Sequence, residues 1–278
     1  MAPFIINLAP TGMVPTSTMS SHVPLTTNSI VSDILSCSEL GVSMAHIHAR
    51  DENGEPTWRP DVYGDIIARI RESRPDLILT VSTSGRRFGD LAQRSAVLDL
   101  PGDLRPDMAS LTLSSLNFSR EASLNAPDMI VRLAEAMAEK GIRPELEVFD
   151  LGMVNVVHSL IKKGLLSPPY YINVILGNAS TAQASLLHIA ALVASLPQPA
   201  VVAFGGIGRS QTPVAGIAAA MADGVRTGLE DNIWLDRNRS TRATNGDLVK
   251  RVIRMAMDQE RTIASPAQVR TILGLPRR

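Results

Sequence analysis

The chain has 278 residues, of which 45% are hydrophobic, and 27 Lys and Arg balance 27 Asp and Glu to a formal net charge of +0. No long basic run occurs, which argues against nucleic acid or an anionic membrane surface as a partner. A single cysteine, Cys37, excludes an intrachain disulfide and fits a reducing compartment. Without a signal peptide or an apolar stretch near about 18 residues, we expect a cytoplasmic protein with no membrane span.

Strand and helix patterns alternate along the whole chain. Short apolar runs predict strands at 4–8, 44–48, 77–82, 108–113, 145–149, 171–176, 201–204 and 225–229. Helical spacing, with Pro or capping residues at the starts and Gly at many ends, predicts helices at 29–40, 61–73, 90–100, 127–140, 154–163, 181–194, 213–222 and 247–260, and a short one from 265.

Strands so short and apolar are typical of a parallel sheet that helices cover. Eight strand–helix units in this length predict a closed (β/α)₈ TIM barrel, formed by residues 1–278 as one domain. The alternative is a doubly wound open sheet. That fold would favour a Gly-rich phosphate turn after the first strand, where Ala9-Pro10-Thr11-Gly12 stands instead.

His46 and His48 lie at the end of the second predicted strand. Residues two apart on a strand point to the same face and are roughly 7 Å apart at the backbone. This spacing suits two imidazoles that bind one metal ion. Two unrelated polar residues at a strand end are the alternative, because a bare H-x-H occurs often by chance.

The carboxyl ends of barrel strands carry the functional groups in such folds. The eighth predicted strand places Arg226, Gly228 and Glu230 on one face. Because the second and eighth strands have the same parity, His46, His48 and Glu230 can meet at one level. Two imidazoles and one carboxylate form the open three-ligand set of catalytic zinc. Glu230 could otherwise be a surface acid or a residue at a helix N-terminus.

Further polar residues follow other strands. Ser82 and the turn 83–85 offer hydroxyls and free N–H groups that could hold a carboxylate, or they form an ordinary turn. Ser115 and Asn117 follow the fourth strand, where they could equally be polar loop residues. An unpaired carboxylate inside a barrel is costly, so Glu147 should be paired, hydrogen-bonded or near the metal.

On these residues the chain resembles the β-keto acid cleavage enzymes, which are zinc-dependent barrels. The resemblance covers nearly the whole chain and is carried by the segments 46–51, 82–85, 114–118, 144–150 and, most specifically, 225–232. Enzymes of this family condense a β-keto acid with acetyl-CoA and release acetoacetate and a new CoA thioester. The resemblance therefore implies acetyl-CoA as co-substrate, one Zn²⁺ per subunit and a homotetramer.

The resemblance also implies a role for each site residue. The metal ligands would be His46, His48 and Glu230. The catalytic residues would be Asp231 as base, Arg226, which orients it and keeps it ionised, and Ser82. The residues that bind and line the substrate would be Ser82, Gly85, Ser115, Asn117 and Glu147.

One departure bears on the substrate. Family members often carry a Glu after the first strand, but Val14 stands at that position here. A keto acid with an amino group, such as 3-keto-5-aminohexanoate, is therefore disfavoured. Two alternatives share the same residues: a mononuclear zinc hydrolase, which would not need a CoA thioester, and a non-catalytic barrel that binds a small carboxylate.

Overall fold

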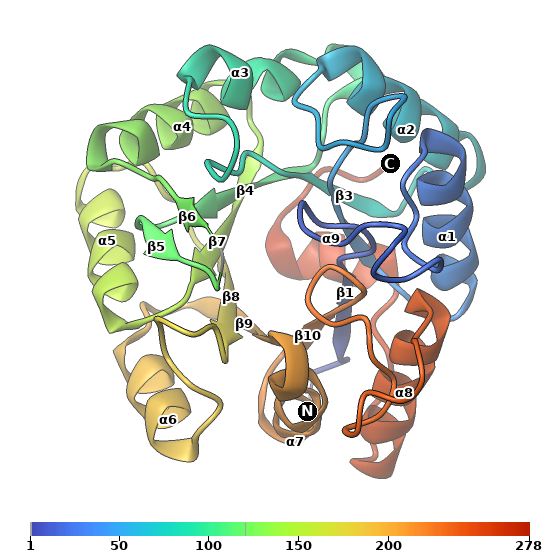
Figure 1. The fold of residues 1–278 in the computed structure, drawn as a ribbon. Coiled ribbons are helices and arrows are strands. Elements are labelled where there is room, and N and C mark those ends of the chain that lie inside the picture. The colour runs from blue at the N-terminus through green and yellow to red at the C-terminus, as the bar shows by residue number, and fades with distance from the viewer. Residues whose placement is uncertain (1, 120) are drawn as a thin grey trace.

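Eight parallel strands close into a barrel that a ring of helices surrounds (Figure 1). The computed structural model describes residues 2–119 and 121–278. Around the barrel the order is β1-β10-β9-β8-β7-β4-β3-β2, so the first strand lies between the second and the last. This confirms the predicted (β/α)₈ fold. The barrel strands are β1 (Ile5–Leu8), β2 (Met44–Ile47), β3 (Ile78–Val81), β4 (Met108–Thr112), β7 (Arg143–Val148), β8 (Tyr170–Leu176), β9 (Ala200–Gly206) and β10 (Gly224–Thr227).

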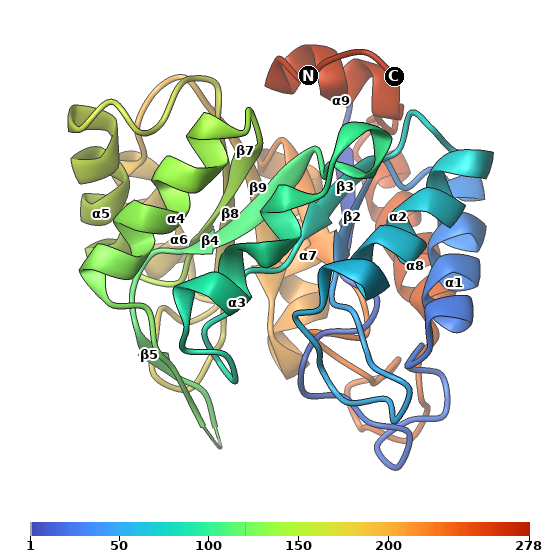
Figure 2. The same cartoon turned by 90° about the horizontal axis from the view of Figure 1, so that it is seen from above.

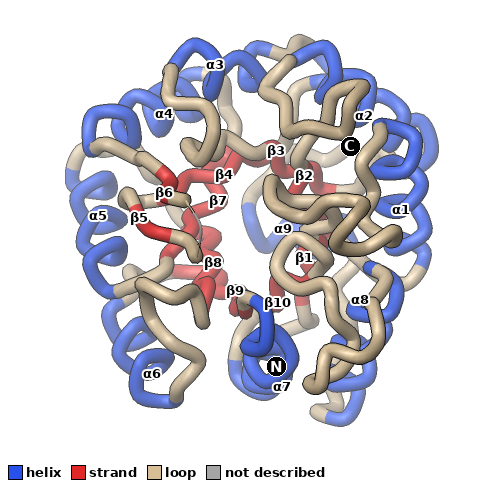
Figure 3. The backbone as a smooth tube through the Cα atoms, viewed as in Figure 1, coloured by secondary structure: helices blue, strands red, loops and turns tan. Residues whose placement is uncertain are grey.

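The helices cover the outer face of the barrel, as the tube in Figure 3 shows. They are α1 (Thr27–Glu39), α2 (Pro60–Ser73), α3 (Leu91–Ser95), α4 (Pro127–Glu139), α5 (Leu151–Lys162), α6 (Leu186–Ser195), α7 (Gln211–Met221), α8 (Asn245–Asp258) and α9 (Pro266–Leu273). None of the helices in the described part of the chain has both the length and the apolar character that a membrane span requires.

Helix α9 closes the amino-terminal end of the barrel (Figure 2). Its Val269 and Leu273 pack in one buried cluster with Ile5, Met44 and Tyr171 from the first residues of their strands. Burial of these side chains fills that end of the barrel with an apolar plug. The polar interior therefore lies toward the carboxyl ends of the strands, where β5 (Leu116–Asn117) and β6 (Ala122–Ser123) form a small projecting hairpin.

Some predicted boundaries were wrong for identifiable reasons. The helix predicted at 181–194 begins only at Leu186, because Ser185 is the cap and its side chain accepts from the backbone N–H of His188. The helix predicted at 90–100 is the short α3 followed by 3₁₀ turns. The strand predicted at 225–229 ends at Thr227, because Gly228 has a φ of +149°, a conformation that few other residues adopt.

Candidate active site

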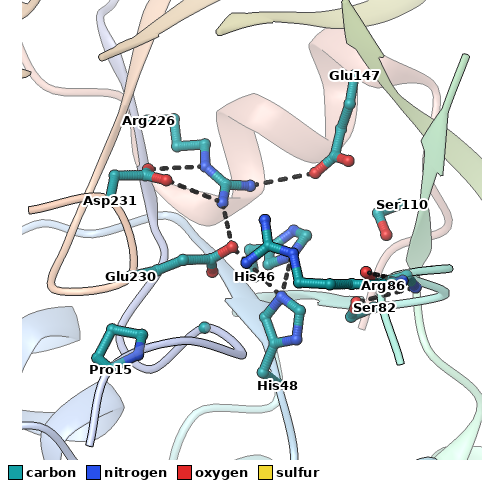
Figure 4. A network of polar contacts seen from close by, with 12 residues as sticks. Pro15, His46, His48, Ser82, Arg86, Ser110, Glu147, Arg226, Glu230 and Asp231 are labelled. Carbon is teal, nitrogen blue, oxygen red and sulfur yellow. Dashed lines mark hydrogen bonds and ion pairs between the residues drawn. The ribbon is translucent and has the colours of Figure 1, made fainter. Parts of the chain in front are cut away.

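A cavity of about 590 Å³ opens at the carboxyl ends of the barrel strands. Most of the residues that the sequence analysis selected line it (Figure 4). These are His46, His48, Ser82, Glu147, Arg226, Glu230 and Asp231. Gly85, Ser115 and Asn117 are not among the lining residues.

The two histidines and Glu230 converge on one point of this cavity. The Nε2 atoms of His46 and His48 lie 3.2 Å apart, and Glu230 Oε1 is 3.3 Å from His48 Nε2. Two ligand atoms bound tetrahedrally to one zinc ion at about 2.0–2.1 Å are about 3.3 Å apart, so both spacings fit a shared ion. Glu230 Oε2 is buried and has no hydrogen-bond partner among the described residues. This donor set therefore suits a divalent metal ion.

A buried carboxylate fixes the orientation of His46. Glu145 Oε2 lies 2.5 Å from His46 Nδ1, and Glu145 Oε1 accepts hydrogen bonds from the side-chain amides of Asn7 and Asn173. With Nδ1 engaged, Nε2 is the nitrogen that faces the cavity, an arrangement typical of metal-bound histidines. Burial opposes protonation of His46, but Glu145 and Glu230 together outweigh it and raise the pKa of the imidazole.

His48 has a different electrostatic environment. Burial lowers the pKa of His48 to about 4, against the attraction of Glu230. His48 is thus neutral at physiological pH, which is the form that binds a metal ion.

Arg226 joins three carboxylates in the interior (Figure 4). Its Nε donates to Asp231 Oδ2 at 3.0 Å, one terminal nitrogen lies 2.6 Å from Glu230 Oε1, and the other donates to Glu147 Oε1 at 3.3 Å. When all three acids are ionised, their negative charge exceeds the charge of Arg226, and the nearby Arg86 offsets a further part of it. A divalent cation between the histidines would add to this compensation.

Asp231 is one of two acids in this group whose pKa is raised by burial, and Glu147 is the other. Burial raises the pKa of Asp231 above its ordinary value of 3.8, and Arg226 only partly opposes that effect. Arg226 thus favours the ionised form of Asp231, as the sequence analysis expected, while burial acts in the opposite direction. A raised pKa brings a carboxylate closer to the operating pH, which favours its use as a general base.

Ser82 and Gly85 have different positions. Ser82 lines the cavity, and its hydroxyl oxygen accepts from the backbone N–H of Ser84 at 3.2 Å. Gly85 is buried behind the cavity wall, where a Cβ atom would lie 2.2 Å from the carbonyl oxygen of Leu124 and 2.6 Å from the Arg94 guanidinium. Gly85 is thus required for close packing against the residues after β6 and is not a lining residue.

The segment after β4 differs from the prediction. The Ser115 hydroxyl accepts from the backbone N–H of Asn125, and the carbonyl oxygen of Asn117 accepts from Asn178. Both residues are exposed, and neither lines the cavity. Phe118 lines the cavity instead and packs under the guanidinium of Arg86 at 3.7 Å from its ring centroid.

Sequence reasoning missed Arg86 as a site residue. It follows the turn after β3 and lines the cavity with its guanidinium directed toward the histidines (Figure 4). Its Nε atom is buried, has no hydrogen-bond partner in the part of the chain that the structure describes, and lies 3.6 Å from Glu121 Oε1. The pair Arg86-Arg87 was too short to stand out as a charge cluster, and only the fold places Arg86 at the barrel mouth.

The loop after β1 forms another part of the wall. Gly12 has a φ of +67°, and a Cβ atom there would lie 2.4 Å from Cγ of Glu230. Val14 lines the cavity and is 41% exposed. This loop therefore holds Glu230 in place and presents an apolar side chain where the family often has an acid.

Fold and site together define a (β/α)₈ barrel enzyme with a candidate metal centre at its mouth. Residues 3–275 match the family model described as beta-keto acid cleavage enzyme, and the chain belongs to this family. It is 32% identical to a 3-keto-5-aminohexanoate cleavage enzyme from Acetoanaerobium sticklandii, with 99% of each chain covered. It is 33% identical to a 3-oxoadipate:acetyl-CoA acetyltransferase from Cupriavidus necator, over 99% of this chain and 95% of that one.

The solved structure of apo ObcA has the same fold. Its TM-score is 0.80 at 23% identity, and the alignment covers 92% of this chain and 66% of ObcA. This likeness supports the barrel architecture. The resemblance identified from the sequence motifs is confirmed by the family match.

Proposed function

We propose that the chain cleaves a β-keto acid with acetyl-CoA as acceptor, and so produces acetoacetate and a new acyl-CoA. The observation that carries this proposal is the convergence of His46, His48 and Glu230 beside the Arg226–Asp231 pair. Relatives whose names specify acetyl-CoA as co-substrate align over nearly the whole chain, which supports the same reaction type. We propose Zn²⁺ as the metal because imidazole and carboxylate are its ordinary ligands.

The metal would supply Lewis-acid stabilisation of negative charge on the keto oxygen. Asp231 would accept a proton from the carbon between the keto group and the carboxylate. That carbon forms a bond to the acetyl carbonyl carbon as the CoA thiolate leaves. The thiolate then adds to the keto carbon, the original carbon–carbon bond breaks, and the proton returns from Asp231, which yields acetoacetate and the new thioester.

Arg226 and Ser82 would position the reacting groups. The bonds from Arg226 fix the orientation of the Asp231 carboxylate, so that its oxygens stay in place during proton transfer. Ser82 lines the same cavity, and we propose that its hydroxyl binds the substrate carboxylate. Glu147 accepts from Thr112 at 2.6 Å and borders the substrate space.

The cavity wall favours a substrate tail without positive charge. Val14 offers no carboxylate to an amino group, and Arg86 places a cation in the wall. An ammonium group on the tail would be desolvated against Val14 and repelled by Arg86. We therefore propose a β-keto acid with a neutral or anionic tail.

The direct test combines metal analysis with an assay of acetoacetate formation from acetyl-CoA and a panel of keto acids. We expect close to one zinc per chain, and loss of metal and turnover in His46→Ala. The matched control is His158→Ala, which removes an exposed histidine of α5 and should change neither. A His46→Ala protein that keeps its metal and its turnover would refute the proposal.

A mononuclear zinc hydrolase would use the same three ligands, and a requirement for the thioester distinguishes the two reactions.

We also propose, from the family resemblance, a cytoplasmic homotetramer. Sedimentation of the purified protein tests the number of subunits.

A further inference from the structure

A second cavity, of about 700 Å³, adjoins the active-site cavity. The loop after β9 and the loop after β10 form it, together with Arg251 of α8. The two cavities have five lining residues in common: Gly208, Arg209, Asn232, Trp234 and Arg239. A ligand in the second cavity can therefore extend past this shared wall toward the metal centre.

The second cavity is strongly positive. Arg209, Arg237 and Arg239 are exposed along it, and Arg251 lies half-buried in its wall. Among the described lining residues the single carboxylate is Asp236. Four guanidinium groups against one carboxylate make a concave surface that attracts multivalent anions.

Asp236 is fixed by contacts within its own loop, and its single negative charge offsets only part of the charge of the four arginines. Its carboxylate accepts from the backbone N–H groups of Ser240 and Thr241, at 3.1 Å and 2.6 Å. These hydrogen bonds lower the pKa of Asp236 to about 2. The Asp236 carboxylate thus stabilises the conformation of the loop after β10.

The walls of this cavity are held by specific contacts. Arg251 donates to the Thr212 hydroxyl at 3.0 Å and to the carbonyl oxygen of Leu235. The Arg242 guanidinium lies over the Trp234 ring at 3.4 Å from its centroid. Such contacts keep the loop after β10 open beside α7, so the cavity exists before any ligand enters.

The position of the cavity also points to phosphate. In (β/α)₈ barrels the loops after the seventh and eighth strands often form a phosphate site. Here β9 and β10 are those strands, and Thr212 and Pro213 from the first turn of α7 line the cavity. Guanidinium groups bind phosphate through paired, charge-assisted hydrogen bonds.

We propose that the second cavity binds the phosphate groups of the acyl-CoA co-substrate through Arg209, Arg237 and Arg239. The pantetheine arm then crosses the wall shared by the two cavities and delivers the thioester to the keto acid. This assignment rests on the proposed function, because that function makes acyl-CoA the co-substrate.

The test is a triple variant, Arg209→Gln, Arg237→Gln and Arg239→Gln, named the cavity variant. CoA binding is measured by calorimetry, with dephospho-CoA and inorganic phosphate as further probes. Turnover is measured with acetyl-CoA and with acetyl-pantetheine, which carries the thioester without the nucleotide phosphates. We expect the cavity variant to bind CoA at least about 10-fold more weakly. Its preference for acetyl-CoA over acetyl-pantetheine should fall by a similar factor.

The matched control is a triple variant at Arg105, Arg132 and Arg277, each changed to Gln, because these arginines are exposed and line neither cavity. It changes the net charge equally and should leave CoA binding and the thioester preference unchanged. An equal loss of CoA affinity in both variants would show a general charge effect and overturn the site.

The binding arm separates this proposal from the proposed function. If CoA binding depends on these arginines but no keto acid is turned over, the phosphate site is supported and the proposed function is refuted. If the cavity variant is active and keeps the wild-type CoA affinity and thioester preference, the proposed function is supported and the phosphate site is refuted. Equal binding of inorganic phosphate and CoA would show a free-phosphate site and also overturn the proposal.

Discussion

Replacement of Glu145 by Gln tests how the metal centre is held. Glu145 is fully buried and serves three donors: His46 Nδ1, Asn7 Nδ2 and Asn173 Nδ2. A glutamine of nearly the same shape has one acceptor oxygen and one amide donor group. It can face the two asparagines or the histidine with its oxygen, but not both.

Each orientation of the glutamine damages the site. If its oxygen faces Asn7 and Asn173, its amide faces His46 Nδ1, and the imidazole proton must move to Nε2, the nitrogen that would bind the metal. If its oxygen faces His46, the amide meets the asparagine donors, and buried N–H groups are left without acceptors. Loss of such a supporting carboxylate lowers metal affinity by roughly 10–100-fold, or about 1.4–2.7 kcal/mol. Unsatisfied donors cost roughly a further 1–3 kcal/mol of folding stability.

The assay is a competition titration of Zn²⁺ against a chelating dye, together with thermal unfolding of the metal-free protein. Glu147→Gln is the matched control, since Glu147 lies on the same strand and contacts Thr112 and Arg226 instead of His46. It also separates two candidate ligand sets, because His46, Glu145 and Glu147 could form a metal site of their own. Metal affinity in Glu145→Gln equal to that of the wild type, or a larger loss in Glu147→Gln, would refute the reasoning.

Three further substitutions test the proposed base Asp231, the cavity-lining residue Val14, and Gly12 in the loop that contacts Glu230. Asp231→Asn should lower kcat by about 10²–10⁴-fold. The wild-type rate should fall as the pH drops through the raised pKa of Asp231. If the rate of the variant falls over the same pH range, Asp231 is not the base. Val14→Glu should raise kcat/KM for 3-keto-5-aminohexanoate about 5-fold relative to a keto acid with a neutral tail, and an unchanged ratio argues against Val14 as a specificity residue. Gly12→Ala should destabilise the protein by roughly 1–3 kcal/mol and weaken metal binding, because the new methyl group meets Glu230. Gly141→Ala, with a similar φ of +64° and no neighbour within 4 Å, should show the strain alone, so equal metal affinities in the two variants would exclude the contact with Glu230.

The fold was predictable because its signals are local. Apolar strands of four to seven residues alternate with capped helices, and closure of a parallel sheet follows from their number. The hairpin β5–β6 could not be predicted, since two strands of two residues each carry no periodicity. Without the hairpin, Ser115 and Asn117 were expected to line the cavity, and the structure does not place them there. The position of a loop residue depends on contacts with residues distant in sequence.

The candidate site was predictable where side chains follow strand parity. His46 and His48 point together because they are two residues apart at a strand end, and Arg226 points inward by the same rule. Glu145 points inward because it is two residues from Glu147 on the same strand, but its partner His46 is 99 residues away in sequence and appears only in the closed barrel. Arg86 was missed for a similar reason, since its contact with Phe118 depends on the unpredicted hairpin.

The proximity of His48 and Glu230 depends on β1, which lies between β2 and β10, the strands that these two residues follow. β1 ends at Leu8, and the chain then turns so that the carbonyl oxygen of Ala9 accepts from the backbone N–H of Glu230. Gly228 allows this approach, because a Cβ atom at that residue would lie 2.0 Å from the Ala9 carbonyl oxygen. Glu230 therefore reaches the histidines from a turn rather than from a strand. Backbone contacts therefore set the separation between the candidate ligands. Substitution of other side chains in the cavity leaves these contacts in place, so residues that line the substrate space can vary without displacing the metal centre.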